Sequence, residues 1–359
     1  PGGPKGMMDD RLRICLLTYR GNPRCGGQGI YIRLLSRELA ALGHTVDVWS
    51  GQPYPELLPG VGLVKVPSLD LWNDAALLRW PGFRELRDSI NRLEYAQSVT
   101  GGFVEPMTFC MRVPRKFSHN GHRAAYDIVH DNQSLGPDLI KVSEHTPVVA
   151  TIHHPITIDR KIGLQSARSL KQRLGLLRWY TFVPSHVRTA RRLDRVITIS
   201  DSSARDLQTE YKLRPEQLRV VGNGINLDVF GPQPQIARDP NRIITILSAD
   251  APLKGFRYLL AAMAELRRSR PALQLTVIGA PGLKSPTRDL IKEHGLADAI
   301  EFTGKVEFEE IPRRYAAASV RGDRLANSVN SQLPTSNSPA HPTRLGWGVG
   351  CWALGVGEG

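Results

Sequence analysis

The first fifty residues alternate between short apolar runs and one long amphipathic segment. An apolar run covers Ile14 to Tyr19, a glycine-rich segment follows it, and apolar residues then recur at helical spacing as far as Gly43. A second apolar run, with β-branched residues, covers Thr45 to Trp49. This order predicts a strand, a turn, a helix and a second strand, which together make a βαβ unit.

Similar patterns continue as far as residue 230. A helix is expected at Asp201–Tyr211, with Ser200 and Asp201 as candidate caps. The segment from Leu69 to Arg92 mixes polar and aromatic residues without a clear period. Strands are expected at Gly62–Pro67, Tyr126–His130, Thr146–His153 and Arg195–Ser200. Arg219–Asn226 is expected to be another strand closed by a turn, with Asn223-Gly224 as the turn signal. In an open α/β sheet, ligands bind at the carboxyl ends of such strands.

A second α/β series begins after a segment with the composition of a linker. Residues 231–240 are rich in proline and polar side chains. The expected strands are Arg242–Ser248, Gln274–Gly279 and Ile300–Gly304, and the expected helices are Phe256–Ser269, Thr287–His294 and Glu309–Ala318. We therefore predict two doubly wound α/β domains, one at 11–230 and a second, incomplete one at 241–320, each with a parallel sheet covered on both faces.

The chain changes character at both ends. Residues 1–10 look like upstream sequence, and residues 321–359 are crowded with Ser, Asn, Pro and Gly without any period. We expect this tail to be unstructured. A sheet that stopped after Val320 would leave an open apolar edge, which is a liability for stability.

Length and composition fit a globular protein. A chain of 359 residues with 41% hydrophobic content is long enough for two ordinary cores. It has no apolar run of about 18 residues to span a membrane, and PGGPKG before Met7 lacks the apolar core expected of a signal peptide. The four cysteines, Cys15, Cys25, Cys110 and Cys351, show neither metal-ligand spacing nor a disulfide framework. A reducing cytoplasm and no bound metal are expected.

The net charge of +13 predicts attraction to phosphates, whether of nucleotides, nucleic acid or anionic lipid. The densest basic stretch runs from Gln165 to Arg195 and contains Arg168, Lys171, Arg173, Arg178, Arg188, Arg191, Arg192 and Arg195, against the single acid Asp194. One interpretation is a solvated helix face over a core stripe. Another is a surface that rests on anionic lipid headgroups. Nucleic acid is the third, and no nucleic-acid module accompanies it.

The glycine-rich turn is a candidate anion site. Gly26, Gly27 and Gly29 precede a helix N-terminus, where free amides and the helix dipole favour negative charge. A dinucleotide fingerprint is disfavoured because Ile32 stands where a small residue is needed and Asp47 lies inside the second strand. A turn that merely joins strand to helix remains the alternative.

Five motifs in order resemble a known family. They are Gly26-Gly-Gln-Gly29, Thr151-Ile-His153, Ile197-Thr-Ile-Ser200, Val221-Gly-Asn-Gly-Ile-Asn-Leu-Asp-Val-Phe230 and Pro252-Leu-Lys-Gly-Phe256. Each motif is weak alone, but the set resembles the two-domain retaining glycosyltransferases of family 4, which have the GT-B fold. The similarity runs from Arg11 to Val320.

The resemblance implies a nucleoside diphosphate sugar as donor, bound mainly by the second domain, and an acceptor on the first. It implies that Lys254 contacts the diphosphate and that His153 contacts the transferred sugar, with His154 in a supporting role. A lysine and helix-terminal amides can stabilise the departing diphosphate without a metal or other cofactor. Donor-binding positions are implied at Gly26, Gly27, Gly29, Asn223, Gly224, Gly255 and Gly304. A solvated lysine and a histidine satisfied at a strand end are the alternative interpretations.

Two departures from the family pattern lower the expected activity. Ala249, followed by Asp250, stands where the family has an arginine, and no paired-glutamate motif follows Val320, since Glu358 is the only glutamate after Glu310. A frame shift or truncation near Val320 would explain this loss.

We therefore predict a retaining, metal-independent glycosyltransferase that is weak or inactive as written. Its expected location is cytoplasmic, peripheral to the membrane, and its acceptor is an unidentified sugar, lipid or small molecule. The alternative is a degenerate, non-catalytic protein that binds a glycan or a lipid headgroup. Nucleic acid is not an expected partner.

Overall fold

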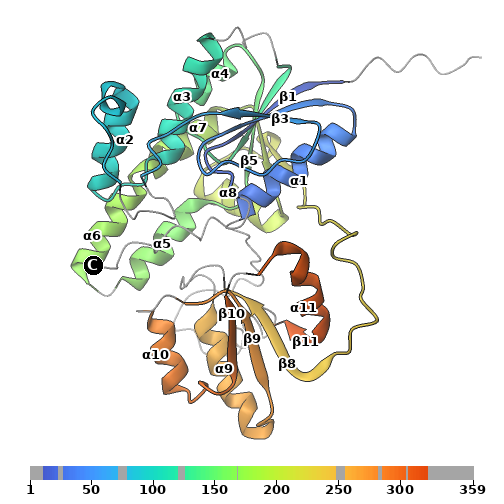
Figure 1. Cartoon of the computed structure of the whole chain (residues 1–359). Coiled ribbons are helices and arrows are strands. Elements are labelled where there is room, and N and C mark those ends of the chain that lie inside the picture. The colour runs from blue at the N-terminus through green and yellow to red at the C-terminus, as the bar shows by residue number, and fades with distance from the viewer. Residues whose placement is uncertain are drawn as a thin grey trace, which may run out of the picture. The chain divides into compact units, whose positions relative to one another are not determined.

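The chain forms two compact units that divide between Asn223 and Gly224. The computed structural model describes residues 11–22, 27–71, 79–119, 126–167, 169–247, 255–281, 285–304 and 306–321 (Figure 1). The division lies a few residues before the boundary expected after residue 230. Arg321, expected to begin the unstructured tail, is instead the last residue of a strand. Residues 322–359 and the predicted upstream segment 1–10 lie outside the described residues.

Unit 1 is built on a seven-stranded, fully parallel sheet. Its spatial order is β3-β2-β1-β4-β5-β6-β7. The strands are β1 (Arg13–Thr18), β2 (Thr45–Ser50), β3 (Val61–Lys65), β4 (Ile128–Asn132), β5 (Val148–Ile152), β6 (Arg195–Thr198) and β7 (Leu218–Val220). Chain order reverses between β1 and β4, which makes the carboxyl ends of these strands the topological switch point.

Helices surround this sheet. They are α1 (Gly27–Ala41), α2 (Ser89–Val99), α3 (Glu105–His119), α4 (Leu139–Ser143), α5 (Ile156–Ser166), α6 (Leu170–Trp179), α7 (Val183–Arg192) and α8 (Asp201–Glu210). Short 3-10 turns are η1 (Glu85–Arg87), η3 (Tyr180–Phe182) and η4 (Pro215–Gln217). None of the helices in the described part of the chain is long and apolar enough to cross a membrane.

The core of unit 1 lies on both faces of the sheet. Along β1, Ile14 and Leu16 pack with Ile32 of α1, whereas Cys15 and Leu17 belong to the larger cluster on the other face. This alternation follows from the two-residue period of a strand. Cys15 and Cys110 are buried, free thiols, and burial raises the pKa of each.

Local signals explain some of the helix boundaries. The predicted cap Ser200 begins α8, because its hydroxyl oxygen accepts a hydrogen bond of 3.1 Å from the amide of Ser203. Asp88 caps α2 in the same way, at 2.6 Å from the amide of Ile90. The basic stretch at 165–195 is not one helix, since η3 separates α6 from α7 and Pro184 occupies the first turn of α7.

Unit 2 has a four-stranded parallel sheet in the described part of the chain, in the order β10-β9-β8-β11. Its strands are β8 (Asp239–Ile246), β9 (Gln274–Ile278), β10 (Ile300–Gly304) and β11 (Ala318–Arg321). Its helices are α9 (Phe256–Ser269), α10 (Pro286–Glu293), the 3-10 turn η6 (Phe308–Glu310) and α11 (Ile311–Ala317). The bounds predicted for α9 are confirmed, and Leu259, Leu260 and Met263 of that helix are buried in the core.

Two predictions for unit 2 are wrong in detail. The expected linker at 231–240 ends early, because Asp239 already pairs with Ala318 in the sheet. The helix expected to reach Ala318 stops at Ala317, and the next residues form β11 instead. Pairing of Val320 with Ile243 covers the edge of β8, so this sheet continues one strand beyond the expected point.

Candidate functional site

Polar side chains gather where β4 and β5 end, and β4 is one of the two strands that flank the switch point of unit 1. Asn132 is the last residue of β4, Gln133 follows it, and His153 follows β5. All three side chains are buried, and His153 is 4% exposed. Because β4 and β5 are neighbours in the sheet, their carboxyl ends bring these residues together.

His153 is held at several points. Its ring Nε2 lies 2.9 Å from Oδ1 of Asn132, and its amide donates to Oε1 of Gln133 at 2.8 Å. Its carbonyl accepts from the hydroxyl of Ser203 at 3.2 Å. The ring of Tyr31 packs edge-on, with centroids 4.8 Å apart and planes at 89°. The imidazole therefore has a fixed position and orientation.

His153 is a neutral imidazole at physiological pH. Burial, with smaller contributions from His154 and His130, lowers the pKa of His153 to about 4. Burial likewise lowers the pKa of His130 to about 4. A neutral imidazole has one donor and one acceptor nitrogen, which suits hydrogen bonding to a sugar hydroxyl.

His154 has a different environment from His153. Its Nε2 lies 2.7 Å from Oδ2 of Asp159 on α5, and its carbonyl accepts from Nε2 of Gln133 at 3.1 Å. Its side chain is thus engaged with α5. The supporting role expected for it stays a prediction.

The loop after β4 is held by a buried carboxylate. Oδ2 of Asp131 accepts from the amides of Ser134 and Leu135, at 2.8 and 2.9 Å, and burial raises the pKa of Asp131 to about 6. Gln133 and Leu135 have φ of 56° and 46°, in the left-handed region that such residues rarely adopt. Strain of this kind is concentrated at functional sites.

The glycine segment meets the same site through α1. Gly26 lies outside the described residues, Gly27 begins α1, and the carbonyl of Gln28 accepts from Nδ2 of Asn132 at 3.5 Å. A Cβ on Gly29 would lie 2.0 Å from the carbonyl oxygen of Asn22. Gly29 is therefore needed for close packing of α1 against the segment after β1.

The predicted positions of the second series have mixed outcomes. Lys254, Ala249 and Asp250 lie outside the described residues. Gly255 caps α9 with φ of 70°, and Gly304 ends β10 with φ of 68°. Asn223 and Gly224 are exposed and lie on either side of the division between the units. Binding roles for these residues remain predictions.

Sequence reasoning missed Asn132, Gln133, Tyr31 and the buried ion pair of Arg20 with Glu105. Nε and Nη2 of Arg20 donate to the two carboxylate oxygens at 2.5 and 2.7 Å. The run of polar residues after the strand at 126–130 was a usable signal for Asn132 and Gln133. Glu105 gave none, because the pairing joins residues far apart in the sequence.

The basic stretch is partly tied down. Nη2 of Arg178 donates to Gln97 at 2.6 Å, Arg191 donates to the carbonyl of Tyr211 at 2.5 Å, and Arg195 donates to the carbonyl of Asp194 at 3.0 Å. Arg168 lies outside the described residues. Among the described residues of this stretch, the exposed cations are Lys171, Arg173, Arg188, Arg191, Arg192 and Arg195.

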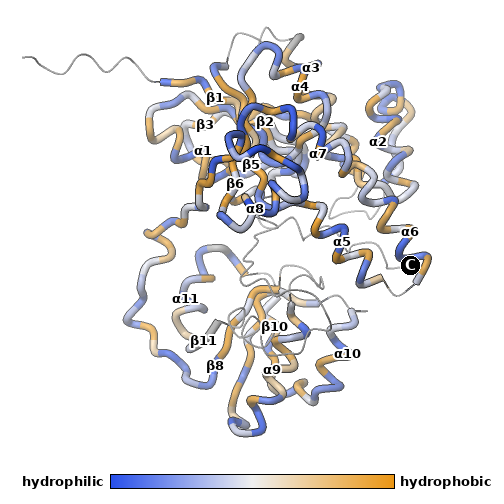
Figure 2. Tube along the Cα trace, turned by 180° about the vertical axis from the view of Figure 1, so that it is seen from behind, coloured by the Kyte–Doolittle hydropathy of each residue, from blue (hydrophilic) through white to orange (hydrophobic). Residues whose placement is uncertain are grey.

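The interpretation of the basic stretch as a solvated face over a core stripe is right only in part. The residues expected to supply its apolar surface are Leu170, Leu174, Leu177, Trp179, Tyr180 and Phe182. Trp179 packs on Phe103 with centroids 4.9 Å apart, and Tyr180 and Phe182 are buried. Leu170, Leu174 and Leu177 are instead 73%, 56% and 38% exposed. These three, at helical spacing on α6, form an apolar stripe that we call the leucine stripe. Figure 2 shows hydrophobic and hydrophilic stretches side by side along this helix.

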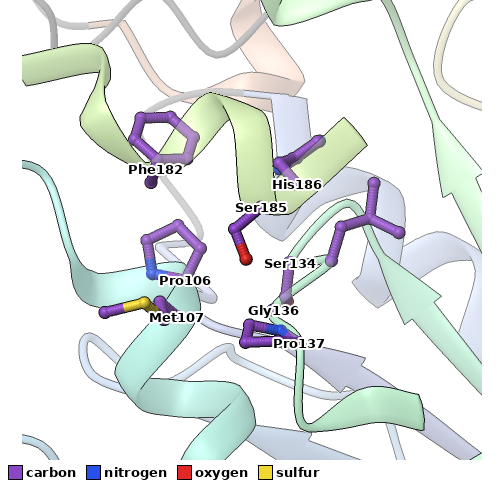
Figure 3. Close-up of a pocket in the computed structure, with 9 residues that line it drawn as sticks. Pro106, Met107, Ser134, Gly136, Pro137, Phe182, Ser185 and His186 are labelled. Carbon is purple, nitrogen blue, oxygen red and sulfur yellow. The ribbon is translucent and has the colours of Figure 1, made fainter. Parts of the chain in front are cut away.

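A small recess lies beside the loop after β4 (Figure 3). Its lining residues are Pro106, Met107, Ser134, Leu135, Gly136, Pro137, Phe182, Ser185 and His186. His186 is buried, and neither of its ring nitrogens has a hydrogen-bond partner among the described residues. Burial lowers the pKa of His186 to about 3, so this ring is neutral as well.

Comparison with known proteins gives two family matches. Residues 25–229 match the family described as Glycosyltransferase Family 4, and residues 232–321 match Glycosyl transferases group 1. The second match ends one residue beyond the point where the resemblance was expected to end.

Two curated relatives have named activities. An MMP alpha-(1->4)-mannosyltransferase of Mycolicibacterium hassiacum is 46% identical over 312 residues, which are 86% of this chain and 74% of the relative. A D-inositol 3-phosphate glycosyltransferase of Thermobispora bispora is 26% identical over 329 residues, which are 85% of this chain and 69% of the relative.

Solved structures show the same fold. Sucrose-phosphate synthase from Thermosynechococcus elongatus aligns with a TM-score of 0.61 at 21% identity, over 87% of this chain and 75% of that one. WaaG, a glycosyltransferase involved in lipopolysaccharide biosynthesis, aligns with a TM-score of 0.56 at 17% identity, over 86% and 74%. The predicted fold class, an α/β protein of the GT-B type, is confirmed.

Proposed function

Because this chain belongs to glycosyltransferase family 4, we propose that it transfers a sugar from a nucleoside diphosphate sugar to an acceptor hydroxyl with retention of anomeric configuration. We infer that the sugar is mannose and that the product bond is α-(1→4). This choice rests on the name of the relative that is 46% identical over 312 residues.

The observation that carries the proposal is the fixed, neutral imidazole of His153 at the carboxyl ends of β4 and β5. A neutral sugar offers hydroxyl groups, and an imidazole nitrogen that lacks a proton accepts a hydrogen bond from one of them. Ligands of an open α/β sheet bind outside the carboxyl ends of its strands at the switch point, which β4 flanks here. We assign His153 the contact with the transferred sugar.

The proposed reaction moves one sugar between two oxygens. The bond between the anomeric carbon and the diphosphate oxygen breaks, and a bond from the acceptor oxygen to that carbon forms on the same face. The acceptor proton leaves to the released diphosphate. Lys254 and the free amides at the start of α9 stabilise the negative charge that develops on the leaving group.

We propose that turnover is slow and needs no metal. Neither the arginine expected at Ala249 nor the paired-glutamate motif after Val320 is present to share the work of holding the donor. Chelation with EDTA should leave the rate unchanged, whereas a rate that needs added Mg²⁺ or Mn²⁺ would assign the diphosphate charge to a metal.

The test is transfer by the full chain. We would incubate it with mannose donors of each nucleoside diphosphate and an α-(1→4)-linked oligomannoside, and follow added mannose by mass spectrometry and its configuration by NMR. One α-linked mannose per released nucleoside diphosphate is expected. Lys254→Ala and His153→Ala should each slow transfer about 100-fold. Lys292→Ala, an exposed lysine at the end of α10, is the matched control.

Two outcomes would contradict the proposal. Equal rates for the chain and for Lys254→Ala would remove that lysine from its assigned role. A folded chain that adds no mannose, but gives saturable heat in calorimetry with the glycan and none with nucleoside diphosphates, would be the non-catalytic binding protein.

We also propose peripheral contact with an anionic membrane through α6. The leucine stripe is exposed, Lys171 and Arg173 lie on the same helix, and α6 contains no acidic residue. A helix that presents leucines and cations suits the interface of an anionic bilayer.

A further inference from the structure

Asn132 and Gln133 contact His153 at two different points, and neither residue was expected to matter. The side chain of Asn132 is hydrogen-bonded to the ring of His153, whereas the side chain of Gln133 is hydrogen-bonded to its backbone amide. Both side chains are buried and adjacent in sequence. Two buried side-chain amides therefore contact the histidine that is assigned to the sugar.

We propose that Asn132 and Gln133 are positioning residues that lock His153 in the tautomer with its proton on Nε2, so that Nδ1 accepts a hydrogen bond from a hydroxyl of the transferred sugar. This inference rests on the proposed function and deepens it. Its ligand is an uncharged, hydroxyl-bearing sugar.

The amide of Asn132 sets the tautomer. Its Nδ2 donates to the carbonyl of Gln28 in the first turn of α1, at 3.5 Å, which directs Oδ1 toward His153. An amide oxygen only accepts, so the facing Nε2 must carry the proton. The opposite tautomer would set two lone pairs against each other at 2.9 Å.

The amide of Gln133 fixes the backbone that bears the ring. Its Oε1 accepts from the amide of His153, and its Nε2 donates to the carbonyl of His154, at 2.8 and 3.1 Å. The side chain of Gln133 thus satisfies one backbone amide and one backbone carbonyl of the segment His153–His154, as a neighbouring strand does in a sheet. The left-handed backbone of Gln133, with φ of 56°, accompanies this arrangement, and a strained conformation persists only where surrounding contacts determine it.

Two further contacts leave the ring little freedom. Tyr31 packs edge-on against it, and Ser203 donates to the carbonyl of His153. Nε2 is already engaged with Asn132, so Nδ1 is the ring nitrogen that remains for a ligand. A weak acceptor held in one place discriminates between hydroxyl positions by geometry, because the sugar must bring its hydroxyl to that atom.

The first test measures the tautomer without any substrate. In the full chain labelled with ¹⁵N-histidine, the NMR signals of His153, assigned by loss in His153→Gln, should show a proton on Nε2 and none on Nδ1. In Asn132→Ala we expect a mixture of tautomers. A proton on Nδ1 in the unsubstituted chain, or an unchanged tautomer in Asn132→Ala, would overturn the inference whatever the enzyme's activity.

The second test separates positioning from folding. Asn132→Ala and Gln133→Ala should lower kcat for sugar transfer about 10-fold, the scale seen when a partner that orients a functional histidine is removed. Affinity for the nucleoside diphosphate alone should stay unchanged, because the proposed function assigns the diphosphate to Lys254 and only the sugar to His153. Asn132→Asp should raise the pH at which activity is lost to protonation of His153, since a carboxylate favours the imidazolium.

A purely structural role predicts another pattern. The variants would then lose melting temperature and nucleoside diphosphate affinity together, while the remaining folded protein kept its tautomer and pH profile. Asn91→Asp, a substitution of the same kind on α2 of unit 1, is the matched control and should leave the His153 signals in place.

Discussion

At the scale of single residues, the glycine segment is defined by what it packs against. Gly29 is buried in α1, and a Cβ there would lie 2.0 Å from the carbonyl oxygen of Asn22. Backbone cannot yield as a flexible side chain does. Gly29, which the sequence suggested as a donor-binding position, is thus required by the packing of the fold whether or not it contacts the donor.

Substitution of this glycine should be costly. Gly29→Ala is expected to lower the free energy of unfolding by about 1–3 kcal/mol through overpacking. The measurement is urea denaturation. Gly175→Ala in α6 is the control, because nothing lies within 4 Å of its added Cβ, and it should be neutral or stabilising by up to about 1 kcal/mol. Equal effects of the two changes would contradict the packing argument.

At the scale of elements, one buried ion pair connects the segment after β1 to α3. Arg20 follows β1, Glu105 begins α3, and their side chains are 6% and 15% exposed. A charge at such a site is costly once its partner is removed. This pair fixes the first turn of α3 near the switch point.

Removal of one partner should destabilise more than removal of both. Glu105→Ala is expected to lower the free energy of unfolding by about 3–5 kcal/mol, because it leaves the Arg20 guanidinium buried without that carboxylate. Arg20→Met combined with Glu105→Leu should recover part of the loss. Urea denaturation of the unsubstituted chain, Glu105→Ala and the double variant gives the three free energies of unfolding. A double variant that is less stable than Glu105→Ala would contradict the prediction.

The leucine stripe of α6 gives the second element-scale prediction. The full chain should sediment with vesicles that contain phosphatidylserine and stay in solution with phosphatidylcholine alone. Leu170→Gln with Leu174→Gln should reduce binding about 10-fold or more, since each leucine removes apolar area from water. Leu42→Gln, at a leucine that is also 73% exposed, is the control. Equal binding to vesicles with and without phosphatidylserine would contradict the proposal.

Elements with a strong period were predictable, and those held by tertiary contacts were not. The strand at Ile14 and the helix at Phe256 carry their burial pattern in the sequence. Helix α3 contains Pro114, and its burial depends on residues distant in the chain, so no local signal announced it. The site divides in the same way. His153 follows a clear strand, whereas the roles of Asn132 and Gln133 depend on loop geometry.

At the scale of the whole molecule, the histidines that are buried in the described part of the chain belong to unit 1. His130, His153 and His186 have pKa values lowered to about 4, 4 and 3, from an ordinary value of 6.5. A histidine that is neutral when folded and protonated when unfolded favours unfolding as the pH falls. Its contribution is present above pH 6.5 and is lost on acidification toward pH 4, by up to about 1.4 kcal/mol per pH unit.

Acidification should therefore destabilise unit 1 selectively. Asp131, whose pKa is raised to about 6, and Glu94, whose pKa burial also raises, oppose the trend, but they are two groups against three. Calorimetry between pH 7 and pH 5 should show a falling melting temperature for the transition that includes unit 1. His186→Phe should flatten that dependence, because His186 lacks hydrogen-bond partners among the described residues. A melting temperature that is constant over this range would contradict the assignment.

The two buried cysteines of unit 1 allow the rate of its local opening to be measured by thiol labelling. Cys15 and Cys110 are fully enclosed, and the raised pKa of each thiol leaves little thiolate to react with a reagent. A chain with Cys25→Ser and Cys351→Ser would be labelled only when β1 or α3 opens to solvent. The labelling rate would then report how often the sheet and helix that support the proposed sugar site open locally in native buffer.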